Sequence, residues 1–294
     1  MLSAKLLGWK ASSYEIYCQA YQKFGGSVCN HPSVLKLLEE KSPSKIRFYH
    51  KEINGEIVGA IFTDNHGNLS HPYKKIPIIF ENIILPICPQ KGGRYLPAKS
   101  KELSFKHKKQ FFNLTYGILN RRSICIVKES FSKKTQKKRQ AEMRRFLANG
   151  GSIAPVTDFS SDELSKIYLK LMNIRWKDKY KDNCVKELAD FIEAIRPMIF
   201  GSVLMFNDTP CAYDLVYKAE CSDWIYFDDH NGGVDTNIKE FSPGSLLLSC
   251  NISDARTLCQ TKSKECIFSL GRSNDKWSYK KLWAHEVKLG KSIF

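Results

Sequence analysis

Apolar residues recur at helical spacing in two pairs of stretches that follow the same order along the chain. "SSYEIYCQAYQKF" and "PSVLKLLEEKSP" form the first pair, and "SSDELSKIYLKLMNIRW" and "NCVKELADFIEAIRP" form the second. Each pair opens with a Ser-x-x-Glu capping box, at Ser12 and at Ser160, and its second stretch stops at Pro43 or Pro197. The pattern therefore predicts two amphipathic helices near the start of each half.

A hairpin pattern follows each helix pair. "IRFYHKEINGEIVGAIF" turns at Asn54-Gly55, and "SVLMFNDTPCAYDLVY" turns at Asn207-Asp208. Beyond the hairpins, "SKELSFKHKKQFFNLTYGILN" leads to the strand "SICIV", as "SPGSLLLSCNISDARTLCQ" leads to "CIFSL". Both halves thus read helix, helix, hairpin, strand, helix, strand, which predicts a tandem α/β duplication with mixed sheets flanked by helices. We expect one domain over residues 1–149 and a second over residues 150–294.

Charge is distributed unevenly between these halves. The 294 residues carry a net charge of +16, with 43% hydrophobic residues, which suits a globular protein. Counting from the sequence, the first 149 residues hold 27 Lys and Arg against 10 Asp and Glu, whereas the remainder holds 19 against 20. Such a basic half favours phosphate-bearing partners, either an anionic membrane surface or tRNA. The residues expected to bind this surface are Lys133, Lys134, Lys137, Lys138, Arg139, Arg144 and Arg145.

Cysteine and histidine spacing indicates neither disulfides nor a metal site. The ten cysteines include no C-x-x-C pair and have no nearby histidine cluster, so we expect reduced, mostly buried thiols. Six histidines are expected on loops or helix surfaces: His31, His50, His66, His71, His107 and His285. No stretch resembles a signal peptide or a membrane span, which favours a cytoplasmic protein.

The segment "NIKEFSPGSLLLSC" predicts a helix whose first turn is open to an anion. Ser242 would be the N-cap and Pro243 the first helical residue. Gly244 leaves the backbone N–H groups uncovered where the helix dipole attracts negative charge. Ser242, Gly244 and Ser245 are therefore candidate phosphate-binding residues, the alternative being an ordinary start of a core helix.

Two further segments carry candidate catalytic side chains. "WIYFDDHNGG" places Asp228, Asp229 and His230 after an aromatic strand, where a carboxylate or the imidazole could accept a proton from an amine. The same composition is also typical of a turn.

In "LGRSNDKWSYKKLW", Arg272 and Lys280 could bind phosphate, and Tyr279 could protonate a leaving group. The alternative is a surface helix anchored by its apolar and aromatic residues.

These segments resemble a known superfamily. The hairpin and strand "GSVLMFNDTPCAYDLVYKAECSDWIYFDDHNGG", the helix "FSPGSLLLSCNISDA" and the ending "FSLGRSNDKWSYKKLW" are similar to Gcn5-related N-acetyltransferases (GNAT). In tandem they resemble FemAB-like and BioF2-like double-domain acyltransferases. The R/Q-x-x-G-x-G/A pyrophosphate loop is absent and "FSPGS" stands in its place. The resemblance therefore leaves acyl-CoA, acyl-carrier protein and aminoacyl-tRNA open as donors.

The opening "GWKASSYEIYCQAYQKFGGSVCNHP" and the length resemble the macrophage-inducible (Mig) antimicrobial-peptide-resistance proteins. The resemblance implies a protein that helps Gram-negative bacteria survive cationic peptides. It also implies a peripheral position on the inner membrane, without crossing it. We thus expect an acyl or aminoacyl transferase whose second half carries the site. Two alternatives stay open, a non-catalytic inner-membrane-associated protein on a transferase-like scaffold and a nucleic-acid-binding regulator.

Overall fold

The computed structural model describes residues 2–73, 75–91, 93–117, 119–176 and 184–293. The chain divides into two compact units, each built from separated stretches. Unit 1 contains Met1–Val127, Ala219–Tyr226 and Ser269–Phe294, and unit 2 contains Lys128–Lys218 and Phe227–Phe268. The boundary predicted at residues 149 and 150 stays a prediction.

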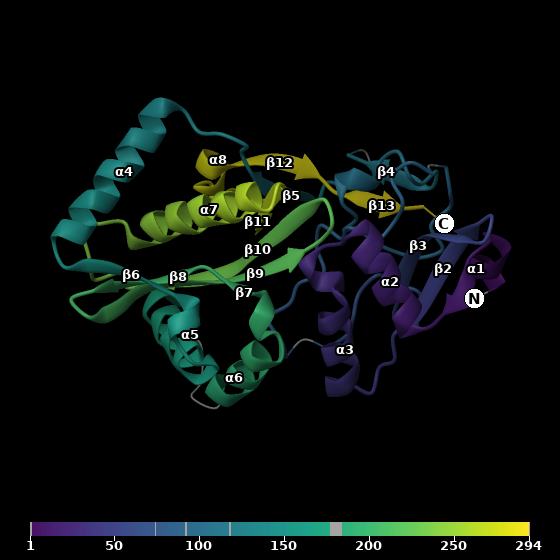
Figure 1. Cartoon of the computed structure of the whole chain (residues 1–294), viewed down its shortest axis with the longest axis horizontal. Helices are drawn as coiled ribbons and strands as arrows, with labels where there is room; N and C mark the ends of the chain where they lie inside the picture. The colour runs from purple at the N-terminus through teal and green to yellow at the C-terminus, as the bar shows by residue number, and fades with distance from the viewer. Residues whose placement is uncertain (1, 74, 92, 118, 177–183, 294) are drawn as a thin grey trace. The chain divides into compact units, whose positions relative to one another are not determined.

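Unit 1 begins with helices packed on a small antiparallel sheet (Figure 1). Its first elements are α1 (Leu2–Leu6), β1 (Lys10–Ser12), α2 (Tyr14–Phe24), a 3-10 helix (Val28–Asn30), α3 (Pro32–Lys41), β2 (Arg47–Ile53) and β3 (Glu56–Thr63). The sheet has the order β1–β2–β3. The Tyr17 ring of α2 lies 5.0 Å from the Phe48 ring and 6.4 Å from the Phe62 ring, centroid to centroid. Aromatic packing thus fixes α2 on this sheet.

Unit 1 also contains two strands from the middle of the chain and the strands near its C-terminus. These are β4 (Leu114–Tyr116), β5 (Ser123–Val127), the end of β11 (Glu265–Arg272), β12 (Ala284–Lys288) and β13 (Gly290–Ser292), with the short helix α8 (Lys280–Trp283). β5 pairs antiparallel with both β11 and β12, and β13 pairs with β4. The predicted strands "SICIV" and "CIFSL" are therefore confirmed as β5 and part of β11.

The helix predicted after the first hairpin is wrong. "SKELSFKHKKQFFNLTYGILN" does not form the predicted α-helix: its described residues contain the 3-10 helix Phe105–His107 and β4. The backbone of this segment pairs with distant residues instead. Leu103 exchanges hydrogen bonds with Gly290, and Ser104 donates to the Ile83 carbonyl. These tertiary pairings use the amides and carbonyls that a helix would need, so they override the local spacing of apolar residues.

Unit 2 is a sheet covered by helices. Its elements are α4 (Lys133–Ala148), β6 (Gly151–Pro155), a 3-10 helix (Val156–Asp158), α5 (Ser161–Trp176), α6 (Cys184–Ala194), a 3-10 helix (Arg196–Met198), β7 (Ile199–Phe200), β8 (Ser202–Phe206), most of β9 (Thr209–Glu220), most of β10 (Trp224–Val234), α7 (Pro243–Thr261) and the start of β11. The strand order is β10–β9–β8–β6, with β7 beside β9.

Helices lie on both faces of this sheet (Figure 1). Leu246 and Leu247 of α7 are buried in one cluster with Leu204 and Ala212. On the other face, the Tyr168 ring of α5 packs edge-on against Tyr213, and Phe191 of α6 packs against Tyr217. Ala212 and Tyr213 are successive residues of β9, so their side chains point to opposite faces. The alternating side chains of β9 thus contribute to the hydrophobic core on both faces of the sheet.

Both predicted turns and one of the two predicted capping boxes are confirmed. Asn54 and Gly55 have φ of 52° and 80°, and Asn207 and Asp208 have φ of 47° and 57°. Positive φ at both central residues is the requirement of a type I′ hairpin turn.

At α5, the Ser160 N–H donates to Glu163 and the Glu163 N–H donates back to Ser160 Oγ, as a capping box requires. At α2 the prediction is wrong by one residue. Ser12 lies in β1, and Ser13 is the cap, accepting from the Ile16 N–H at 3.4 Å.

The environment of the cysteines was predicted better than that of the histidines. All ten cysteines are free thiols, and most are buried. Three histidines expected at the surface are instead buried: His50, His71 and His107 are 6%, 2% and 1% exposed. Each has a fixed hydrogen-bond partner, among them the Leu85 N–H, which donates to His107 Nε2. Hydrogen bonds to the ring nitrogens make burial of these imidazoles tolerable. Within the described ranges, no helix has both the length and the apolar character needed to cross a membrane.

Candidate functional site

The strongest candidate site lies in unit 2 and contains two aspartates, one buried and one half-buried. Asp214 lies within β9 at 8% exposure, and Asp229 is half-buried on β10. Arg175, near the end of α5, donates from Nη1 to the Gly232 carbonyl at 2.6 Å. This arginine also acts electrostatically on Asp214. Strands β9 and β10 and helix α5 therefore bring two carboxylates and one guanidinium to the same region.

Burial dominates the electrostatics of this pair. Loss of solvent raises the pKa of Asp214 well above its ordinary value, the charge of Asp229 raises it further, and the Arg175 guanidinium opposes the shift. A neighbouring carboxylate disfavours ionisation of a buried one, so Asp229 and burial act on Asp214 in the same direction. A raised pKa makes Asp214 a better proton acceptor than an isolated surface aspartate.

Asp228, Asp229 and His230 lie inside β10 and not in the turn that their composition also allowed. Successive strand residues point to opposite faces, so Asp228 and Asp229 do not form the adjacent carboxylate pair that their sequence positions suggest. The His230 ring lies 6.0 Å from the Tyr217 ring, and burial lowers the pKa of His230 to about 4. His230 is therefore neutral at pH 7.

Asp214 was missed by sequence reasoning. Its signal is a lone carboxylate inside the apolar run "CAYDLVY". Buried aspartates are rare unless they have a specific role or partner. Its partner on β10, however, depends on strand pairing, which residue types alone do not specify.

The predicted start of α7 is confirmed, but few of its amides are available. Ser242 is the N-cap and Pro243 the first helical residue, without a side-chain cap bond from Ser242. The Ser245 and Leu246 N–H groups both donate to the Ser242 carbonyl. Pro243 has no N–H, which leaves the Gly244 amide as the first-turn donor. A Cβ on Gly244 would lie 3.0 Å from Val234 Cγ2, so close packing against β10 also favours glycine here.

Arg272 belongs to an ion-pair network in unit 1, and Lys280 contacts the backbone beside it. Arg272 Nη2 lies 2.7 Å from Glu102 Oε1, and Arg272 Nε lies 3.6 Å from Glu81 Oε2. Lys280 donates from Nζ to the carbonyls of Leu270 and Arg272. Burial raises the pKa of both glutamates, and Arg272 opposes both shifts. The two predicted phosphate-binding residues, Arg272 and Lys280, thus lie close together. Both already contact carboxylate or carbonyl oxygens of the protein.

Tyr279, the predicted acid, lies at the start of α8 in the same unit. Its side chain is 45% exposed, and its ring packs edge-on against Trp277 at 6.3 Å. The surface position agrees with the alternative of an exposed helix, and the catalytic role stays a prediction.

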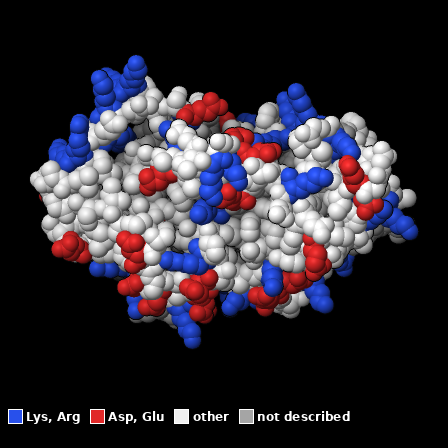
Figure 2. Space-filling model, in the orientation of Figure 1, with Lys and Arg blue, Asp and Glu red and all other residues white. Residues whose placement is uncertain are grey.

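The seven predicted surface cations all lie on α4, in unit 2. Figure 2 shows their positive charge gathered over this helix, at the upper left of the view. Among the residues of α4, Phe146 is buried and most others are exposed. Phe146 packs against Phe206 and Phe241, which attaches the C-terminal end of α4 to unit 2. The N-terminal turns thereby present cations to solvent.

Three of these cations have structural partners. Lys138 Nζ lies 4.0 Å from Glu142 Oε1. Arg139 lies 2.9 Å from Glu142, and Arg145 donates to the Glu240 carbonyl and lies over the Phe241 ring. The side chains of Lys133, Lys134 and Lys137 form no ion pair with any described residue. These lysines are therefore the part of α4 best suited to an external anion.

Comparison with known proteins identifies the family. Residues 31–292 match the family model of Mig-14. The chain belongs to the Mig-14 family. No curated protein sequence matches it.

Several solved structures are similar to this Mig-14 family member, and one of them establishes its fold. The crystal structure of FemX is 9% identical, with a TM-score of 0.55 over 97% of each chain. A conserved protein of unknown function from Bacteroides thetaiotaomicron VPI-5482 is 13% identical, with a TM-score of 0.41 over 61% of this chain and 62% of that chain. A tandem GNAT protein from the clavulanic acid biosynthesis pathway is 8% identical, with a TM-score of 0.42 over 97% of each chain. The likeness to FemX confirms the predicted α/β fold.

Proposed function

We propose that this Mig-14 family member is an acyl or aminoacyl transferase that acts in bacterial resistance to cationic antimicrobial peptides. The observation that carries the proposal is the Asp214–Asp229 pair, a proton acceptor held within a FemX-like fold. An acceptor amine would attack the acyl carbon of the donor and release its proton to this pair. The C–N bond forms as the donor's C–S or C–O bond breaks, and the leaving thiolate or alkoxide is then protonated.

The donor in this proposal is an acyl-CoA, an acyl-carrier protein or an aminoacyl-tRNA. The Gly244 amide, at the positive end of α7, would donate to an anionic group of the donor, with Ser242 and Ser245 beside it. Asp228 and His230 flank Asp229 on β10 and remain candidates for positioning the amine. The roles predicted for Tyr279, Arg272 and Lys280 stay predictions.

Complementation tests the proposal and does not require an identified substrate. A bacterial strain that lacks this protein would receive the wild type, Asp229→Asn or the control Asp190→Asn, and its survival in a cationic peptide would be measured. Asp190 is an exposed aspartate on α6, so it matches the chemical change outside the site. General-base loss lowers a rate by about 10²–10⁴-fold, so Asp229→Asn should survive no better than the empty strain. Equal rescue by Asp229→Asn and wild type, at equal protein levels, contradicts catalysis.

A second candidate function is non-catalytic attachment to the inner membrane. The exposed lysines of α4 favour it, because a basic helix with few buried residues is suited to a surface of anionic phosphate groups. In this case Asp229→Asn would keep resistance, whereas neutralising the lysines of α4 would remove it. The nucleic-acid-binding alternative would instead require that α4 bind RNA or DNA in preference to lipid.

A further inference from the structure

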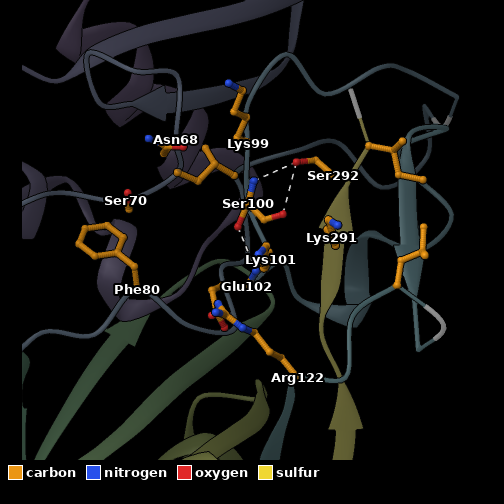
Figure 3. A pocket seen from close by; sticks show the side chains of 13 residues that line it. Asn68, Ser70, Phe80, Lys99, Ser100, Lys101, Glu102, Arg122, Lys291 and Ser292 are labelled. Atoms are coloured by element: carbon orange, nitrogen blue, oxygen red, sulfur yellow. Dashed lines mark hydrogen bonds and ion pairs between the residues drawn. The ribbon is translucent and has the colours of Figure 1, made fainter.

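A cavity of about 560 Å³ lies in unit 1, whereas the aspartate pair and α4 belong to unit 2. Its walls come from separated parts of unit 1, as Figure 3 shows: the loop after β3 with Asn68, the segment around Ser100, and β13 with Ser292. Phe80 and Arg122 complete the lining that the figure labels. Ligand pockets in proteins have volumes of roughly 300–1,000 Å³, so this cavity has the size for a small organic molecule.

Backbone and side-chain hydrogen bonds fix the walls of this cavity. The Ser100 N–H donates to Ser292 Oγ at 2.9 Å, and the Ser292 N–H donates to the Ser100 carbonyl at 2.9 Å. The Leu69 N–H donates to the Lys99 carbonyl, which joins the loop after β3 to the same segment. Because distant stretches are tied at several points, the cavity is largely preformed.

Positive charge predominates along its lining. Lys99, Lys101, Arg122 and Lys291 contribute side chains, against one carboxylate among the described lining residues, that of Glu102. Within the described part of the chain, no residue forms an ion pair with Lys99, Lys101 or Lys291. An adjoining cavity of about 420 Å³ shares Lys101 and Arg122 and adds two more guanidinium groups, those of Arg121 and Arg272.

Glu102 orients Arg122 and Arg272. Its single negative charge does not balance the positive charge of the lysines and arginines around the two cavities. Its Oε1 atom accepts from Arg122 and from Arg272. The Glu102 side chain is buried, and a buried carboxylate between two arginines fixes their planes. Arg122, whose side chain is 41% exposed, keeps further donors for a group in the cavity.

We propose that this cavity binds a small molecule through its phosphate group. Three lysines without ion partners among the described residues, together with an oriented arginine, suit a multivalent oxyanion better than a singly charged group. Leu69, Phe80 and Ile293 form an apolar part of the same lining, which would contact the organic portion of the ligand. Binding here does not depend on the transfer reaction proposed above, so loss of one leaves the other intact.

Isothermal titration of the full-length protein with inorganic pyrophosphate, at low ionic strength, tests this site. The variant is Lys101→Gln with Lys291→Gln. The matched control is Lys36→Gln with Lys109→Gln, two exposed lysines of unit 1 that do not line the cavity. Charge-assisted hydrogen bonds contribute enough that the cavity variant should bind at least about tenfold more weakly than wild type. The control should bind as wild type does.

Three results would overturn the proposal. The first is no heat of binding by wild type up to millimolar pyrophosphate. The second is an equal loss in the cavity and control variants, which would mean that net charge alone attracts the anion. The third comes from a titration with citrate, a multivalent carboxylate. Citrate that binds as tightly as pyrophosphate would show that the site does not select phosphate.

Discussion

Gly232 lies directly against the carboxylate of Asp214, so closely that a Cβ on residue 232 would be 1.5 Å from Asp214 Oδ1. The next residue, Gly233, is equally constrained from another side, because its Cβ would be 2.5 Å from the Leu171 Cβ of α5. The Gly-Gly pair has the composition of a turn, yet both residues lie inside β10. Their lack of side chains makes room for the buried acid and for the helix.

The first prediction concerns this contact. Gly232→Ala should lower the free energy of unfolding by about 1–3 kcal/mol, because the added methyl group must displace Asp214 or separate β9 from β10. Urea denaturation followed by circular dichroism measures the change.

Combining Gly232→Ala with Asp214→Ala checks the cause. Removing the carboxylate relieves the overlap, so the double variant should lose less stability than the sum of the two single variants. Additive losses would show that some other contact of Gly232 is responsible.

Sequence patterns predicted the parts of the fold that depend on local interactions. The turn at Asn54-Gly55 and the cap at Ser160 depend on residues a few positions apart, and both are confirmed. The helix predicted around Leu103 does not form, because the backbone hydrogen bonds of this segment go to Ile83 and Gly290. Its apolar spacing was compatible with a helix, and only distant strand partners decide against it.

The candidate site was likewise predicted only where it depends on neighbouring residues in the sequence. "WIYFDDHNGG" indicated Asp229 through residue type. Asp214 becomes its partner only once β9 and β10 lie side by side, and a shift of one residue in pairing would reverse the faces. The cavity lined by Lys101 and Lys291 was equally hidden, since 190 positions in the sequence separate these two residues.

A second prediction concerns the pH dependence of stability. Burial lowers the pKa of His107 from its ordinary 6.5 to about 4, while Nε2 accepts from the Leu85 N–H at 2.8 Å. As pH falls below 6.5, the unfolded chain binds a proton at this histidine and the folded chain does not. Stability is therefore complete above pH 6.5 and falls between pH 6.5 and 4, by about 3 kcal/mol for this group.

Urea unfolding at pH 7 and at pH 5 measures this loss. His31 and His230 have pKa values lowered in the same direction, so the variant His107→Gln should reduce the pH dependence without abolishing it. His66→Gln, at an exposed histidine, is the matched control and should leave the dependence unchanged. An unaltered slope in His107→Gln would mean that this imidazole titrates alike in both states.

The third prediction concerns the lysines at the start of α4. Lys133, Lys134 and Lys137 are exposed on a helix attached mainly through Phe146, so a charged surface can reach them without disturbing the core. Changing all three to Gln should weaken binding to anionic vesicles by about 1 kcal/mol per residue. Sedimentation with anionic vesicles, with neutral vesicles and, separately, retention on tRNA measure which phosphate surface is bound.

The triple variant Lys36→Gln, Lys109→Gln and Lys239→Gln is the control for the third prediction, since it removes the same charge from exposed positions outside α4. If α4 is the docking element, this control binds as wild type does, and the wild type loses affinity as salt screens the attraction. Retention on anionic vesicles alone supports peripheral membrane association, and retention on tRNA alone supports an aminoacyl donor. A wild type that binds neither surface at low salt would show that the cations of α4 have no phosphate partner, because electrostatic attraction is strongest under that condition.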